Sequence, residues 1–151
     1  MKITRAERIA GLLGGARPTA ETGVLVDTLV LMLAADGKKK PGELEEAVAI
    51  AAHLPGAKGR PAEEMQKWVD DSLASIRVEG RKARLESIAQ RLTRNTDRED
   101  AFRLAAALRF ADGEVADEED QMLVALRDAL QIDPDRADVL VEDVESRLLK
   151  A

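Results

Sequence analysis

An aspartate followed directly by glycine, with a glutamate seven residues after the aspartate, occurs twice in this sequence. The first copy places Asp36 before Glu43, and the second places Asp112 before Glu119. Carboxylate oxygens are the ligands that hard cations such as Ca²⁺, Mg²⁺ and Mn²⁺ prefer. If one helix ends at each aspartate and the next begins near each glutamate, the two carboxylates face each other across a tight corner. The spacing therefore indicates two candidate cation sites.

A simpler interpretation uses the same residues as helix signals. Gly37 and Gly113 suit the left-handed residue that ends many helices, and acids in a first helical turn stabilise it by about 0.3 to 1 kcal/mol each. This leaves Asp36 and Asp112 unexplained, because an acid in a last turn faces the negative end of the helix dipole. One corner supplies only two carboxylates, and Asp117 stands where an EF-hand loop requires glycine. An EF-hand is excluded, whereas a cation site and a pair of helix caps both remain open.

Other residues offer little chemistry for catalysis. The chain has no cysteine, which excludes disulfides, thiolate metal sites and a cysteine nucleophile. His53 is the single histidine, and we expect it at a helix end, where the dipole favours a positive charge. Trp68, the single tryptophan, is expected to fill the core or an interface. We therefore predict that the protein is not an enzyme.

The elements that must position these residues are predicted to be helices. Aromatic residues make up 2% of the chain, and no segment alternates apolar and polar residues over the length of a strand. Apolar residues instead recur at three and four positions. We expect Leu29, Met32, Ala105 and Leu108 to be among the most buried. The expected helices are a short one near 5–13 and seven others, which begin near 19 or 21, 41, 61, 81, 97, 117 and 133. Of their first residues, Asp97, Asp117 and Asp133 are predicted to act as N-caps.

The repeated motif belongs to a longer internal duplication. A shift of 76 residues also places the apolar positions of 47–54 on those of 123–130. We predict one domain over 1–151, with repeat halves at about 19–78 and 97–150 joined by a helix at about 80–95. The fold class is all-α, a compact bundle of about seven to eight helices built from two three-helix units, which bury their apolar surface against each other.

Charge is distributed unevenly along the chain. Residues 112–145 carry thirteen acidic and two basic residues, whereas the whole chain has a net charge of −6. Basic residues border the joining helix, at Arg77, Arg81, Lys82, Arg84, Arg91, Arg94 and Arg98. Acids interrupt this run and no aromatic residue is interleaved to stack on a base, so we expect a solvated helix face and no nucleic acid partner. Contact with anionic lipid or with an acidic protein remains an alternative use of the basic residues.

The expected location is the cytoplasm. The most apolar segment, 24–35, has twelve residues and contains Asp27, whereas a membrane span needs about twenty. The basic beginning of the chain is followed by only a short and broken apolar run, too weak for a signal peptide. The absence of cysteine is compatible with a reducing compartment.

The second copy of the motif, RFADGEVADEEDQMLVALRDAL, carries a resemblance to a known family. With its duplicate, it resembles the TerB-like tellurite-resistance family over about 19–149, and also the TerB-like N-terminal domain of a membrane-anchored DnaJ-type co-chaperone. The resemblance implies a compact helical domain with acidic positions thought to chelate a divalent cation, here Asp36, Glu43, Asp112 and Glu119. The first copy departs from the family pattern, since Lys39 replaces the usual Val or Ile.

The same resemblance implies a function in tellurite resistance or the stress response. It predicts a non-enzymatic protein that binds a divalent cation, Ca²⁺, Mg²⁺ or Mn²⁺, and acts through a protein partner. The alternative is a co-chaperone-like interaction adaptor without a metal site, in which the acidic corners are helix caps only.

Overall fold

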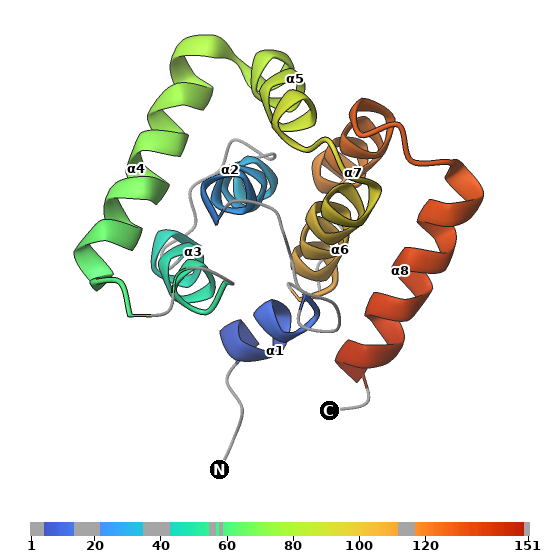
Figure 1. The fold of residues 1–151 in the computed structure, drawn as a ribbon, viewed down its shortest axis with the longest axis horizontal. Helices are drawn as coiled ribbons and strands as arrows, with labels where there is room; N and C mark the ends of the chain where they lie inside the picture. The colour runs from blue at the N-terminus through green and yellow to red at the C-terminus, as the bar shows by residue number, and fades with distance from the viewer. Residues whose placement is uncertain are drawn as a thin grey trace.

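A computed structural model describes residues 5–13, 22–34, 43–54, 57, 59–111 and 117–149 of the chain. These residues form helices and no strand, which confirms the predicted all-α bundle of about seven to eight helices (Figure 1). The helices are α1 (Arg5–Gly11), α2 (Thr22–Leu33), α3 (Glu43–Ala52), α4 (Ala62–Glu79), α5 (Arg81–Arg91), α6 (Asn95–Ala111), α7 (Asp117–Ala129) and α8 (Pro134–Leu149).

Helices α2 and α6 contact each other in the middle of the bundle. Helix α4 packs on α2 and α8 packs on α6, and Figure 1 shows α4 and α8 on opposite sides of the molecule. Helix α3 contacts α2, and α7 contacts α6, while α5 contacts α2, α4 and α7. The repeat halves at 19–78 and 97–150 remain a prediction from the sequence.

The core is centred on apolar side chains of α2 and α6, and those of α6 include Phe102 and Leu104 as well as small residues. Eight of the twelve residues of α2 are buried, since this helix is apolar around most of its circumference. Helix α6 contributes four fully buried alanines, Ala101, Ala105, Ala106 and Ala107. The predicted burial is confirmed for Leu29, Met32, Ala105 and Leu108, whose exposed fractions are 0%, 2%, 0% and 4%.

The ends of the helices agree with the sequence in part. Asp133 caps α8 as predicted, because its Oδ1 accepts a hydrogen bond from the backbone N–H of Asp135 at 2.9 Å. The prediction of Asp97 as an N-cap is wrong. Helix α6 begins at Asn95, since the Arg98 N–H already donates to the Arg94 carbonyl at 3.0 Å, and Asp97 is a buried residue of its first turn. Asp117 is likewise the first helical residue of α7 and not a residue before it.

A single residue, Gly80, separates α4 from α5. Its φ of 88° and ψ of 162° lie in a region that favours glycine. Its N–H donates to the Ile76 carbonyl at 2.9 Å and its carbonyl accepts from the Arg84 N–H at 3.2 Å. Gly80 thus ends one helix and starts the next.

Within the described part of the chain, every helix is too short or too polar to cross a membrane.

Candidate functional site

The two predicted cation corners fall at the junctions from α2 to α3 and from α6 to α7. Glu43 is the first residue of α3, and Glu119 is the third residue of α7. Asp36 and Asp112 lie outside the described residues, and so do the side chains of Glu43 and Glu119. Both glutamates thus stand in the first turn of a helix, as two carboxylates facing each other across a corner require. Cation coordination by the four carboxylates remains a prediction.

An ion pair joins α6 to α7 next to the second corner. The guanidinium group of Arg109, on α6, donates from Nε to the carboxylate of Asp120, the residue after Glu119. The same guanidinium group lies 5.1 Å from the centroid of the Phe110 ring. The side chains of Arg109 and Asp120 are 20% and 39% exposed, so solvent screens the pair only in part. One acid in the first turns of α7 is therefore neutralised by the preceding helix.

A different arginine lies at the end of α2, next to the first corner. Arg81, the first residue of α5, donates from Nη2 to the backbone carbonyl of Ala34 at 2.9 Å. The last carbonyls of a helix have no partner within the helix and carry the negative end of its dipole. Arg81 satisfies one carbonyl of this region and brings a positive charge to the negative end of α2.

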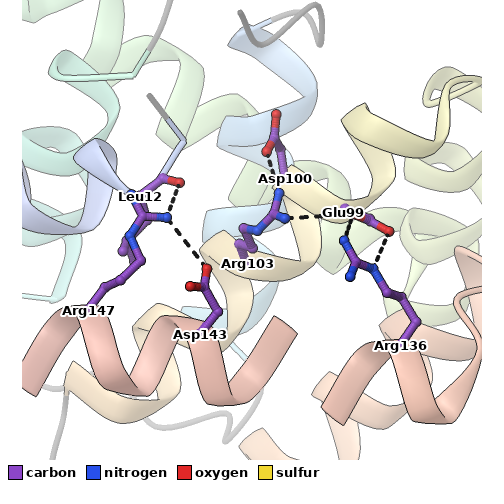
Figure 2. Close-up of polar contacts among 7 residues, drawn as sticks. All are labelled: Leu12, Glu99, Asp100, Arg103, Arg136, Asp143 and Arg147. Atoms are coloured by element: carbon purple, nitrogen blue, oxygen red, sulfur yellow. Dashed lines mark hydrogen bonds and ion pairs between the residues drawn. The ribbon is translucent and has the colours of Figure 1, made fainter. Parts of the chain in front are cut away.

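Acidic and arginine side chains also tie α8 to α6 (Figure 2). Arg136 of α8 donates to both carboxylate oxygens of Glu99, at 2.9 and 2.8 Å. Arg103 lies 3.7 Å from Glu99 and 3.0 Å from Asp100. The hydrogen bond from Arg136 is the main reason that the pKa of Glu99 is lowered, whereas burial raises the pKa of Asp100. The Glu99 carboxylate thus links α6 to α8, whereas Asp100 is paired with an arginine of its own helix.

The lowered pKa of Glu99 predicts a pH-dependent contribution to stability. A carboxyl group whose pKa is lowered in the folded state stabilises the protein at any pH above its ordinary pKa, which is 4.5 here. This contribution is lost as the pH falls through the lowered pKa of the folded state. We expect Glu99→Gln to lower the melting temperature at pH 7 by about 2 to 4 °C. The difference from the wild type should shrink below pH 4.5 in thermal scans from pH 7 to pH 3. A difference that stays constant over this range would contradict the assignment.

Asp27 is the charged residue within the apolar helix α2, and it binds two arginines of α5. Its Oδ2 forms an ion pair with Nη2 of Arg84 at 2.9 Å and accepts a hydrogen bond from Arg91, while its side chain is 13% exposed. From the sequence, Asp27 is only a charge that interrupts an apolar segment. Burying an unpaired charge is energetically costly, so an aspartate within an apolar helix predicts that a basic side chain packs against it.

Arg98 reaches the ends of two helices at once. It donates from Nε to the carbonyl of Leu92 at 2.6 Å, from Nη1 to that of Leu130 at 3.0 Å and from Nη2 to that of Ala89 at 3.3 Å. The carbonyls of Ala89 and Leu92 belong to the end of α5, and that of Leu130 follows α7. Together with the contacts above, four of the basic residues around the joining helix bind within the protein: Arg81, Arg84, Arg91 and Arg98.

His53 is exposed and directly follows α3, in agreement with the expected helix-end position. Among the described residues, no group of three or more histidine, aspartate and glutamate side chains is arranged to hold a metal ion. Trp68 is partly buried and packs against the core. Its position agrees with the expected role as a filler.

Comparison with models of protein families identifies a family for this chain. The family model described as "Tellurite resistance protein TerB" matches residues 23–140, from the second residue of α2 into the first half of α8, and so includes both copies of the Asp-Gly motif. The searches of curated proteins and of solved structures gave no match.

Proposed function

Since the chain belongs to the TerB family of tellurite resistance proteins, we propose that it is a non-enzymatic cytoplasmic protein of tellurite resistance or the stress response. It binds a divalent cation at its acidic helix–helix corners and acts through a protein partner. The second corner, with Asp112 and Glu119, is the stronger site, because Lys38, Lys39 and Lys40 crowd the first one with positive charge.

One observation carries this proposal: the same Asp-Gly motif with its glutamate recurs at two equivalent helix junctions. Helix α6 ends at Ala111, directly before Asp112, and α7 has begun by Glu119. Oxygen donors of this kind suit Ca²⁺, Mg²⁺ or Mn²⁺ and do not suit a soft metal. Two carboxylates are fewer than the six to eight oxygens that Ca²⁺ takes, so backbone carbonyls, water or a partner would complete the shell.

A second candidate function is supported by the ion pair of Arg109 with Asp120. This pair already joins α6 to α7 across the second corner, so the junction can be held without an ion. In that case the protein is a co-chaperone-like adaptor that only binds another protein, and the repeated acids serve as helix caps.

Thermal unfolding with added cation separates the two candidates. If Asp112 and Glu119 hold a cation, then Ca²⁺, Mg²⁺ or Mn²⁺ at a hundredfold excess over its dissociation constant adds about 2.7 kcal/mol to the free energy of unfolding. We expect the melting temperature to rise accordingly at fixed ionic strength. Asp112→Asn should abolish the rise, and Asp36→Asn should reduce it less.

The matched control is Asp138→Asn, which removes the same charge from an exposed residue of α8. General screening by salt acts on all acids of this region. A rise in melting temperature that came from screening would therefore be reduced equally by Asp112→Asn and Asp138→Asn. Equal reduction, or no cation-dependent shift in the wild type, would favour the adaptor.

A further inference from the structure

A pocket of about 170 Å³ lies where α2, α4 and α5 meet. Helix α2 lines it with Gly23 and Asp27, α4 with Trp68, Asp71 and Ser72, and α5 with Arg91. A β-carbon added to Gly23 would meet no atom within 4 Å, so the space beside this residue is open. Protein cavities of about 150 Å³ admit a molecule the size of benzene, which has about six non-hydrogen atoms. The pocket therefore has the volume for a small metabolite.

Ser72, a buried residue that lines the pocket, has a hydroxyl group without a hydrogen-bond partner among the described residues. Ser72 is 3% exposed, and its Oγ makes no hydrogen bond to the part of the chain that the structure describes. Buried polar groups in native proteins are nearly always hydrogen-bonded, to protein, water or ligand. A ligand with an oxygen acceptor would satisfy the Ser72 hydroxyl.

The pocket also contains a guanidinium group with unused donors. Arg91 donates from Nε to the Ser87 carbonyl at 3.3 Å and from Nη2 to Asp27. Its Nη1 donors make no hydrogen bond to the described residues, and its side chain is 37% exposed. Asp27 shares its charge with Arg84 as well, so it neutralises Arg91 only in part. A carboxylate is the group that fits such a guanidinium group best.

The opposite wall of the pocket suits a positive charge. Asp71 is exposed and forms no ion pair within the described part of the chain. Trp68 lines the same side of the pocket, and the guanidinium carbon of Arg60 lies 4.9 Å from the centroid of its ring. An ammonium group in the pocket would be attracted by the Asp71 carboxylate.

We propose that this pocket binds a small zwitterion of the α-amino acid class. The carboxylate of the ligand binds Arg91 and the Ser72 hydroxyl, and its ammonium group binds Asp71 beside Trp68. The site is separate from the acidic corners, so this activity goes beyond the proposed function and does not depend on cation binding.

The fluorescence of Trp68 tests the proposal directly, because Trp68 is the only tryptophan of the chain. The probes are glycine, L-alanine and L-serine, titrated at fixed ionic strength. Acetate and methylammonium serve as the two halves of the ligand. We expect a saturable change in fluorescence with at least one amino acid, at a dissociation constant at least tenfold below that of either half. No saturable change with any amino acid, or equally tight binding of one half, would overturn the proposal.

Two variants separate binding in the pocket from an indirect effect. Gly23→Leu places a side chain in the open space and replaces glycine by a better helix former, so the fold is kept. We expect affinity to fall at least tenfold with an unchanged circular dichroism spectrum. Asp71→Asn should weaken binding about tenfold, whereas Asp70→Asn should not, since Asp70 is exposed outside the pocket and contacts Gln66 at 3.0 Å. Wild-type affinity in Gly23→Leu, or equal effects of Asp71→Asn and Asp70→Asn, would contradict the site.

Discussion

Leu29→Ala is expected to lower the free energy of unfolding by about 2 to 5 kcal/mol, the range for a buried leucine. Leu29 is fully buried in α2, which contacts α3, α4, α5, α6 and α7. Helices on so many sides cannot all move inward to fill the space left by the isobutyl group, so most of the cavity remains. Urea denaturation monitored by circular dichroism measures the loss.

The matched control is Val139→Ala on α8, where the side chain is 51% exposed. Removing apolar surface that stays in water changes stability by about 0.5 kcal/mol or less. A loss below 1 kcal/mol in Leu29→Ala would show that α2 is not the central helix of the bundle.

Arg98→Met is expected to lower the free energy of unfolding by about 2 to 4 kcal/mol. Methionine keeps much of the apolar stem but removes the donors to three backbone carbonyls. A hydrogen bond from a charged donor contributes about 1.5 to 3 kcal/mol, and water can replace part of this at a half-buried site. The loss should therefore be well below three times that of a single bond.

Hydrogen exchange identifies the location of this effect. Arg98→Met should speed amide exchange at the ends of α5 and α7 beyond its effect on the rest of the protein. Arg94→Met removes the same charge from an exposed residue nearby and should change neither stability nor exchange appreciably. If both variants behave alike, the three carbonyl contacts of Arg98 do not stabilise the helix ends.

Local sequence patterns predicted the helices and the core because both depend on neighbours in the chain. The spacing of apolar residues predicted the burial of Leu29 and Leu108, and Asp133 before proline predicted the start of α8. The first residue of a helix was predicted less well where several neighbouring residues were suitable N-caps. Asp97 was a suitable cap by type, yet the chain entered the helix two residues earlier.

Contacts between distant residues could not be predicted in the same way. The chain has 23 basic and 29 acidic residues, and nothing local distinguishes Arg136 as the partner of Glu99. Arg98 and Leu130 are 32 residues apart and meet only because α5, α6 and α7 converge. At the candidate site, the motif predicted that the two glutamates stand at helix starts. It could not indicate that Asp120 is bound by Arg109.

Gly80 leaves no slack between α4 and α5, because it is the single residue between them. A displacement of α4 away from α2 must therefore pull the start of α5, and with it the contacts of Arg81 to Ala34 and of Arg84 to Asp27. The positions of the two helices are therefore coupled through the backbone angles of Gly80 alone. A longer connection would let α4 move without disturbing the contacts of α5 with α2.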